Sequence, residues 1–244
     1  MIIKQAVILS AGLGTRLRPI TDNIPKVMVP LVGKPLLEWH IEQFKKHGVT
    51  EFFINLHYLP DAITNYFGDG AKFGVRITYA YEPEIMGTAG GMKNFDGALG
   101  NVFFLMYGDM ASFLDYTKMA DAFFAKPSDA LGMMVVGHND HPQDSDLVVA
   151  DETLKFRNIH IKPHKKIPPK FHTMDAAFVF RKEILKHIPA KVRYQIDHDL
   201  LPKILAEGKS FYGYETSDYL YDVGTMDRYR AVEEYVRKHV AKGK

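Results

Sequence analysis

Apolar runs alternate along the chain with segments whose apolar residues recur at helical spacing. Short apolar or β-branched runs predict strands, whereas repeats every three or four residues predict helices. Strands are therefore expected at 6–9, 51–56, 75–81, 102–107, 130–136, 147–150, 154–161, 210–215 and 219–221. Helices are expected at 35–47, 60–67, 115–126, 196–207 and 226–242, and another opens near Gly87. This alternation predicts an α/β fold with a mostly parallel sheet and helices on both faces.

Proline, glycine and threonine mark where several of these helices begin and end. Pro35 suits a first helical position, and Gly48 suits the residue just past the helix end. Pro202 lies inside the apolar pattern of the segment 196–207 and is expected to break or bend that helix. Thr225 is expected to cap the last helix at its N-terminus.

Composition limits the kinds of protein that this chain can be. Its 244 residues allow one large domain, or one domain with a small addition. The formal net charge of +2 argues against a general nucleic-acid binder, and the absence of cysteine excludes disulfides, thiolate nucleophiles and Cys-ligated zinc. The first fifty residues hold seven Lys or Arg against three Asp or Glu, which favours an anionic substrate near the N-terminus.

The N-terminus carries no pattern of a signal peptide, because the apolar stretch 6–9 is short and Arg16 follows soon after. No apolar stretch approaches the length that spans a membrane. We therefore expect a cytoplasmic protein without a membrane or nucleic-acid partner.

The glycine-rich run Leu9–Lys26 carries the strongest chemical signal in the sequence. Gly12 and Gly14 let the backbone curl, and the free amides of such a turn suit phosphate oxygens. Arg16 adds a two-pronged donor for phosphate, and Lys26 adds a compact charge. A P-loop would need Lys-Ser/Thr after the second glycine, and a dinucleotide fingerprint would need a small residue at Leu17. Neither pattern is met.

The run Ser10–Pro19 (SAGLGTRLRP), followed by Ile24-Pro25-Lys26 and Gly33-Lys34-Pro35-Leu36, resembles the signature of sugar-1-phosphate nucleotidyltransferases. The resemblance implies a Rossmann-like αβα sandwich with a mostly parallel mixed sheet. It also implies an enzyme that transfers a nucleoside monophosphate from a nucleoside triphosphate to a sugar-1-phosphate and depends on Mg²⁺. The expected organisation is one domain, with a nucleotide-binding part at about 1–137, a sugar-binding part at about 138–225 and a C-terminal helix at 226–242.

Two aspartates follow apolar strands, where ligands bind in open α/β sheets. The pair Gly108-Asp109 comes directly after the run 102–107, and Asp222 follows an aromatic strand in the motif Asp222-Val223-Gly224-Thr225. Carboxylate oxygens suit Mg²⁺. The resemblance makes Asp109 and Asp222 the two metal ligands.

The resemblance also assigns residues to each substrate. Arg16 and Lys26 are the expected catalytic residues. The expected nucleotide-binding residues are Leu9, Ala11, Gly12, Gly14, Thr15, Arg16, Glu82, Gly87, Thr88 and Asp109. Contacts with the sugar phosphate are expected from Lys26, Lys162 and Asp175.

The base is expected to be guanine, because the Glu82 carboxylate accepts hydrogen bonds only and guanine presents two adjacent N–H donors. Length and the run Gly87–Gly91 look closest to guanylyltransferases acting on mannose- or heptose-1-phosphate. Uridylyl- and thymidylyltransferases share nearly all of these residues and stay as alternatives.

Some positions depart from the family pattern. Ile161 stands where relatives commonly have a glutamate before Lys162-Pro163, and Ala177 stands where they have the glycine that ends a small-residue turn. His138 and His141 meet no ligand spacing and are expected to be solvent-exposed loop histidines.

Two other classes of protein are alternatives. A non-catalytic regulatory relative would bind nucleotide or sugar without turnover, although Arg16, Lys26, Asp109 and Asp222 are retained. A glycosyltransferase would usually carry an Asp-x-Asp pair, and the run Gly108–Ala111 lacks the second acid. Release of pyrophosphate from a nucleoside triphosphate mixed with a sugar phosphate distinguishes a nucleotidyltransferase from both alternative classes.

Overall fold

Two units make up the structure, a computed structural model that describes residues 1–138 and 142–240. Unit 1 contains Met1, Met86–Leu105 and Thr117–Ser217, and unit 2 contains Ile2–Ile85, Met106–Tyr116 and the chain from Asp218 onward. Each unit therefore combines stretches that are distant in sequence. Strand β6 (Val102–Tyr107) contributes its first four residues to unit 1 and its last two to unit 2.

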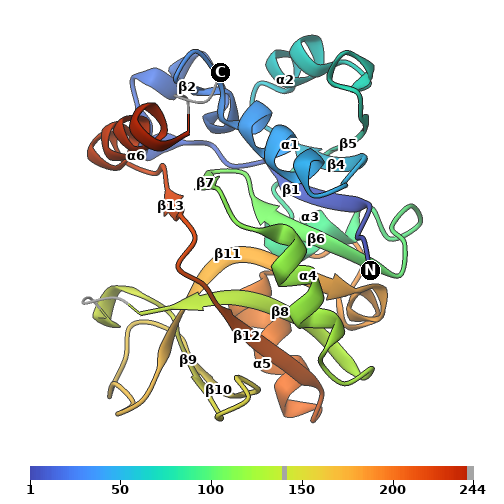
Figure 1. Ribbon diagram of the computed structural model, residues 1–244, viewed down its shortest axis with the longest axis vertical. Coiled ribbons are helices and arrows are strands. Elements are labelled where there is room, and N and C mark those ends of the chain that lie inside the picture. The colour runs from blue at the N-terminus through green and yellow to red at the C-terminus, as the bar shows by residue number, and fades with distance from the viewer. Residues whose placement is uncertain (139–141, 241–244) are drawn as a thin grey trace. The chain divides into compact units, whose positions relative to one another are not determined.

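Unit 2 is built on three parallel strands, β1 (Gln5–Leu9), β4 (Glu51–Leu56) and β5 (Arg76–Tyr81). Leu9 is opposite Asn55, and Leu56 is opposite Tyr81, so the carboxyl ends of the three strands meet at one edge. Figure 1 shows β1, β4 and β5 together with the helices of this unit, which are α1 (Leu36–Lys46), α2 (Pro60–Phe67) and α6 (Met226–His239).

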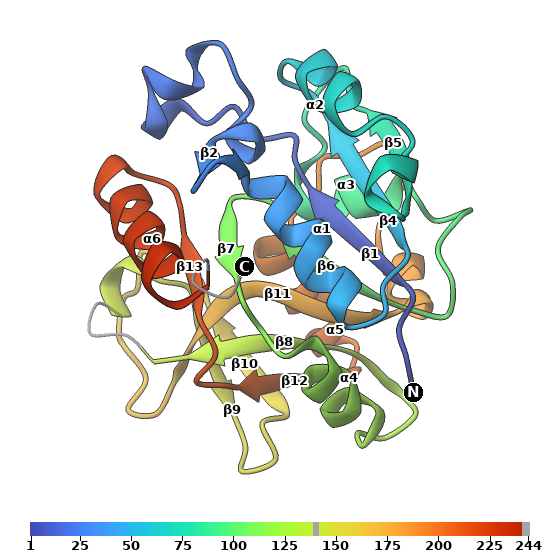
Figure 2. The ribbon, with the colours of Figure 1, turned by 45° about the horizontal axis from the view of Figure 1, so that its top comes forward.

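Aromatic packing holds α1 against the strands of unit 2. The rings of Phe44 on α1 and Phe52 on β4 meet edge to face with centroids 6.2 Å apart. Phe44 also stacks on Tyr116 with centroids 4.0 Å apart. Both views show α1 beside β1 and β4 (Figure 2). The helix begins one residue after Pro35, which has extended backbone angles.

Two short antiparallel ladders complete unit 2; of their strands only the one expected at 219–221 was predicted, and it lies at 220–222. Strand β2 (Pro30–Leu31) pairs with β3 (Lys34–Pro35), and β7 (Met110–Ser112) pairs with β13 (Leu220–Asp222). Beside them lies a buried apolar cluster drawn from α1, α6 and the ladders, made of Leu31, Leu36, Trp39, Ala111, Val223, Val232 and Val236. This cluster anchors α6 next to the end of β13.

Unit 1 has a mixed set of strands centred on β8 (Ala130–Gly137). Strand β11 (His172–Arg181) runs antiparallel to β8, and β12 (Ser210–Glu215) runs parallel to it. Strands β9 (Leu147–Ala150) and β10 (Phe156–His160) pair with each other, and β9 also pairs with β11. Its helices are α3 (Gly87–Lys93), α5 (Leu201–Ala206) and most of α4 (Tyr116–Phe124).

The predicted α/β class is confirmed, and the strands at 51–56, 102–107, 147–150 and 210–215 have the predicted bounds. The helix expected at 196–207 is divided into a π-helical turn, Ile196–Leu200, and α5, with Pro202 in the first turn of α5. The segment stays helical from Ile196 to Ala206, so the predicted helix is confirmed, and Pro202, which lacks an amide donor, lies just after the change from π- to α-helical geometry. Thr225 caps α6 as predicted and accepts a hydrogen bond from the Arg228 amide.

The segment expected to hold a small-residue turn is instead part of β11. Its pairing with β8 shifts register between Met174 and Phe178, which marks a bulge or other irregularity within the strand. His141 lies outside the described residues. Among the residues that the structure describes, no helix is long and apolar enough to cross a membrane.

Candidate active site

The glycine loop leaves β1 and closes on itself through Gly14. Gly14 has a φ of 66°, in the left-handed region that favours glycine. Its carbonyl accepts hydrogen bonds from the Thr21 hydroxyl at 2.7 Å and from the Leu17 amide at 3.0 Å. A Cβ at Gly14 would lie 3.2 Å from Lys26 Cβ. The loop is therefore folded tightly against the segment that carries Lys26.

Two polar side chains at the strand ends of unit 2 hold the start of this loop. The Ser10 amide donates to Asn55 Oδ1 at 2.7 Å, and Asn55 Nδ2 donates to Glu82 Oε1 at 2.9 Å. Glu82 is buried, with 1 % of its surface exposed. The predicted nucleotide-binding residue Glu82 thus contacts the loop through Asn55. Sequence reasoning missed Asn55, although its place near the end of a buried strand was a signal.

The two predicted metal ligands, Asp109 and Asp222, lie together in unit 2. The β7–β13 ladder aligns them, because the Val223 amide donates to the Asp109 carbonyl at 3.0 Å. Lys26 Nζ lies 2.7 Å from Asp109 Oδ2 and 3.5 Å from Asp222 Oδ1. The Lys26 side chain is only 9 % exposed. A nearly buried cation therefore joins two carboxylates that come from distant parts of the chain.

Two arginines bring further positive charge to this pair. Arg228 Nη1, from the first turn of α6, donates to Asp222 Oδ2. A Cβ at Gly224 would lie 3.0 Å from Arg16 Nη2 and 2.7 Å from both carboxylate oxygens of Asp222, so Arg16 lies beside the same turn. Sequence reasoning identified Arg16 and missed Arg228. Two carboxylates and three cations leave this cluster net positive, as an anionic ligand requires.

Gly108 places Asp109 by close backbone packing. A Cβ there would lie 2.7 Å from both the Leu9 carbonyl and Val27 Cγ1, and the Gly108 amide donates to that carbonyl at 2.9 Å. His40 Nε2 lies 3.3 Å from the Gly108 carbonyl. Burial lowers the pKa of His40 to about 4, so at neutral pH the imidazole is uncharged and donates through Nε2. His40 thereby fixes the residue before Asp109.

The donor set of this cluster fits a hard divalent cation. Asp222 Oδ1 is buried and makes no hydrogen bond within the described part of the chain, and the nearby Lys26 Nζ, at 3.5 Å, is an ion-pair partner only. A buried carboxylate oxygen without a hydrogen bond can take a further cationic ligand. Together with Asp109, it offers the oxygen ligands that Mg²⁺ prefers.

The turn at Gly87–Gly90 is shaped by a neighbouring segment of unit 1. Gly87 has a φ of 76°, and a Cβ there would lie 2.7 Å from the Tyr194 carbonyl. The Thr88 hydroxyl donates to Gln195 Oε1 at 3.0 Å and accepts from the Ile196 amide at 2.7 Å. The close approach of residues 194–196 therefore requires small residues in this turn for packing, in addition to the expected contact with a base.

Lys162 and Asp175, the residues expected at the sugar phosphate, both belong to unit 1. Lys162 is exposed, and its Nζ donates to the Asp144 carbonyl at 2.8 Å. The Lys162 amide donates to Asp146 Oδ1, and His198 Nε2 lies 2.9 Å from Asp146 Oδ2. Burial raises the pKa of Asp175 on β11 to about 6. A carboxyl group with a raised pKa is typical of functional sites.

A glycine loop and paired carboxylates at the strand ends of an α/β sheet are typical of proteins that handle phosphorylated nucleotides. Residues 5–239 match the family model described as "Nucleotidyl transferase". The chain therefore belongs to the nucleotidyl transferase family.

Known proteins of two base specificities resemble the chain. A UTP–glucose-1-phosphate uridylyltransferase from Synechocystis is 30 % identical over 92 % of this chain and 61 % of its own length. A mannose-1-phosphate guanylyltransferase from Mycobacterium tuberculosis is 30 % identical over 91 % of this chain and 62 % of its own length. The chain thus spans about three fifths of these curated relatives.

A solved structure with the same fold extends the comparison. The crystal structure of HddC from Yersinia pseudotuberculosis complexed with GMP-PN has a TM-score of 0.77 and is 25 % identical. It covers 95 % of this chain, and the match includes 99 % of that chain. The predicted fold class and the predicted family are thereby confirmed.

The raised pKa of Asp175 predicts how stability changes with pH. The folded state holds the proton more tightly than the unfolded state, where the pKa is 3.8, so the free energy of unfolding falls between about pH 4 and pH 6. Asp175→Asn removes the charge and should raise the free energy of unfolding at pH 7 by about 1–3 kcal/mol. Urea denaturation should show a smaller gain at pH 4.5. The exposed Asp61→Asn variant is the control, and an Asp175→Asn gain independent of pH contradicts the assignment.

Proposed function

We propose that the chain is a sugar-1-phosphate nucleotidyltransferase that takes a nucleoside monophosphate from a nucleoside triphosphate and joins it to a sugar-1-phosphate. The main support is the arrangement of Lys26 between Asp109 and Asp222, beside the arginine of the glycine loop. Opposite charges held this closely at strand ends suit a reaction between two phosphorylated anions. Membership of the nucleotidyl transferase family supports the same reaction.

The glycine loop is proposed to hold the triphosphate. Arg16 is exposed and presents a planar fork of donors to the phosphate oxygens. Lys26 neutralises charge near the phosphorus that is attacked. The other proposed nucleotide contacts are Leu9, Ala11, Gly12, Gly14, Thr15, Glu82, Gly87, Thr88 and Asp109. Lys162 and Asp175 are proposed to contact the sugar phosphate.

Asp109 and Asp222 are proposed to hold Mg²⁺. When bound there, the ion supplies positive charge to phosphate oxygens that would otherwise repel the attacking group. Asp222 Oδ1, buried and without a hydrogen bond within the described chain, supports this role. Arg228 and Lys26 keep the two carboxylates in place through their ion pairs.

The chemistry needs positioning and charge more than proton transfer. An oxygen of the sugar phosphate attacks the α-phosphorus and forms a new P–O bond, while the bond to the β-phosphate breaks and pyrophosphate leaves. A phosphate monoester has a second pKa of about 6 and is largely dianionic at neutral pH, so the step needs no general base. Arg16 and Lys26 therefore act by orienting the reactants and stabilising charge.

Guanosine triphosphate is the nucleotide that we propose as favoured. The guanylyltransferase from Mycobacterium tuberculosis and the HddC complex with GMP-PN support this choice. The uridylyltransferase from Synechocystis supports the alternative, a uridylyltransferase, at equal identity. Glu82 is the residue proposed to distinguish the bases, although its Oε1 also accepts from Asn55.

A panel of four nucleoside triphosphates crossed with hexose- and heptose-1-phosphates tests the reaction. Pyrophosphate should form only when both substrates are present, and fastest with GTP. In Glu82→Gln, the ratio of kcat/KM for GTP over UTP should fall, because the amide replaces an acceptor-only group. An equal loss with every nucleotide would instead make Glu82 a positioning residue that acts through Asn55. Absence of pyrophosphate from every pair contradicts the proposed function.

Removing either carboxylate tests the proposed metal ligands. Asp222→Asn and Asp109→Asn should each lower kcat at least about tenfold, which corresponds to losing about 1.4 kcal/mol of transition-state stabilisation. Turnover is measured under saturating Mg²⁺, and circular dichroism checks the fold. Asp227→Asn, an exposed aspartate in the first turn of α6, is the matched control and should keep parental turnover. Parental turnover in Asp222→Asn would remove the metal role.

A further inference from the structure

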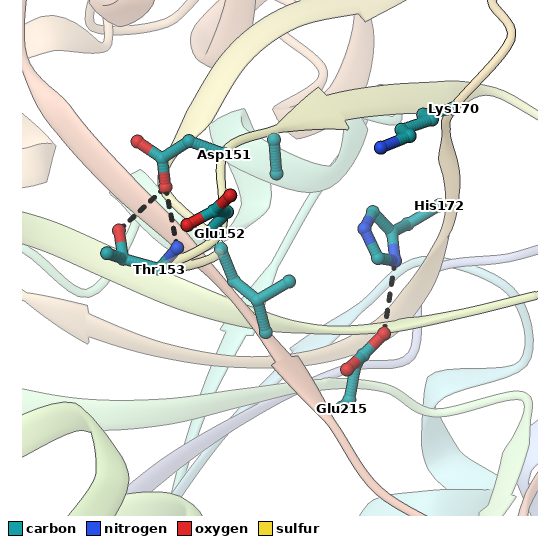
Figure 3. A pocket seen from close by; sticks show the side chains of 8 residues that line it. Asp151, Glu152, Thr153, Lys170, His172 and Glu215 are labelled. Atoms are coloured by element: carbon teal, nitrogen blue, oxygen red, sulfur yellow. Dashed lines mark hydrogen bonds and ion pairs between the residues drawn. The ribbon is translucent and has the colours of Figure 1, made fainter.

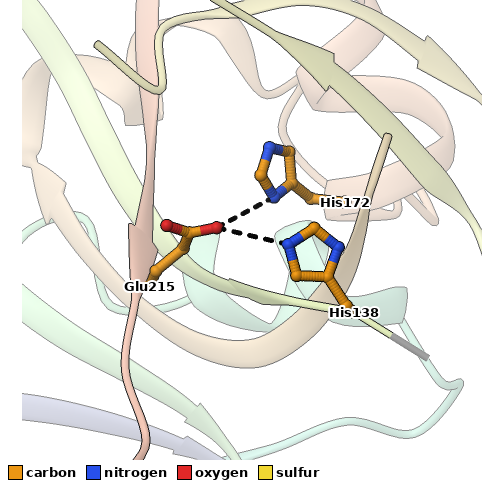
Figure 4. Close-up of side chains that lie close together, drawn as sticks. All are labelled: His138, His172 and Glu215. Atoms are coloured by element: carbon orange, nitrogen blue, oxygen red, sulfur yellow. Dashed lines mark ion pairs between the residues drawn. The ribbon is translucent and has the colours of Figure 1, made fainter. Parts of the chain in front are cut away.

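Two histidines and a glutamate meet at one end of three neighbouring strands in unit 1. His138 directly follows β8, His172 is the first residue of β11, and Glu215 is the last residue of β12. The strand registers bring them together, because Thr173 is opposite Gly137 and Glu215 is opposite Val136. Figure 4 shows both imidazole rings turned toward the same carboxylate.

The two distances from the imidazoles to the Glu215 carboxylate match those between ligands of a tetrahedral metal ion. His172 Nδ1 lies 3.3 Å and His138 Nε2 lies 3.4 Å from Glu215 Oε1. Ligands about 2.05 Å from a tetrahedral zinc ion would be about 3.3 Å apart. The three ligand atoms all lie within 4.8 Å of one another. They could therefore converge on one ion after small side-chain movements.

One of the three proposed ligand atoms is buried and makes no hydrogen bond in the part of the chain that the structure describes. His172 Nδ1 is buried and makes no hydrogen bond with the described residues, although it faces Glu215. Buried polar atoms in native structures are usually satisfied, so an atom like this one calls for an explanation. An ion bound between the imidazole and the carboxylate would provide the missing partner.

The cluster is open to solvent on one side. His172 and Glu215 line a pocket of about 660 Å³, together with Lys170 and residues 150–154 (Figure 3). The His138 side chain is 67 % exposed and that of Glu215 is 50 % exposed. An ion could therefore enter without local unfolding, and a water molecule could complete its coordination.

We propose that His138, His172 and Glu215 form a binding site for a divalent transition-metal ion, with Zn²⁺ as the best match to two imidazoles and one carboxylate. The site would join the ends of β8, β11 and β12. His138 is exposed and lies just outside β8, as expected of a loop histidine, and the proposal adds a ligand role to it. A second group, Asp146, Asp197 and His198, holds a single imidazole and suits Zn²⁺ less well. The proposal does not depend on the proposed function.

Zinc affinity of the whole chain tests the site directly. After removal of metal with a chelator, Zn²⁺ is titrated in competition with a chromophoric chelator, in excess Mg²⁺ to occupy oxygen-only sites. One zinc ion should bind per chain. His138→Gln, His172→Gln and Glu215→Gln should each weaken binding at least about tenfold, the loss that follows even from removing an outer partner of a metal ligand. His138→Gln is the most informative of the three variants, because the His138 side chain is the most exposed and its replacement should disturb folding least.

His187→Gln is the matched control. In the parental chain, His187 Nδ1 pairs with Glu207 at 2.7 Å in the same unit. This pair resembles the proposed site in having a histidine beside a glutamate, but it has no second imidazole. This variant should retain parental zinc affinity. Diffraction at the zinc absorption edge should place the anomalous peak between His138, His172 and Glu215. Parental affinity in His138→Gln, or a peak at another position, overturns the proposal.

Discussion

The contact of Lys26 with two carboxylates is the interaction on which the rest of the candidate active site depends. Asp109 and Asp222 are negatively charged and are brought close by the β7–β13 ladder, so they would repel each other without a cation nearby. Lys26 lies 2.7 Å from one and 3.5 Å from the other, and Arg228 pairs with Asp222. A pair of carboxylates balanced in this way can accept a divalent ion and an anionic substrate, because the surrounding cations keep the net charge positive.

The backbone around this cluster is arranged to keep it in place. Gly108 lets the chain after β6 pass within contact of the Leu9 carbonyl, and uncharged His40 holds the Gly108 carbonyl without adding charge beside Asp109. At the other end, Thr225 caps α6, whose apolar face packs with Trp39 and Val223. Each carboxylate is therefore supported by packing that is independent of the ion pair itself.

The hydrophobic pattern predicted most of the strands because buried strands such as 102–107 are apolar throughout, whatever they pair with. Motifs predicted Arg16, Lys26, Asp109 and Asp222 because each follows a recognisable strand or loop. A strand was expected at 219–221, where β13 lies, but β7 was not, since a three-residue strand leaves little periodicity. Their pairing could not be predicted because it joins residues more than a hundred positions apart. The partners of His138 became identifiable only when folding brought them together, because their contacts are distant in sequence. Asn55 carried a weak signal in its place near a strand end, but its contact with Ser10 did not.

The most direct measurement is a crystal structure with a non-hydrolysable guanosine triphosphate analogue and Mn²⁺, whose anomalous signal locates the ion. The account predicts polyphosphate oxygens against the amides of Gly12–Arg16 and the ion bound to both Asp109 and Asp222. An ion that contacts neither aspartate, or a polyphosphate bound away from the glycine loop, would contradict it.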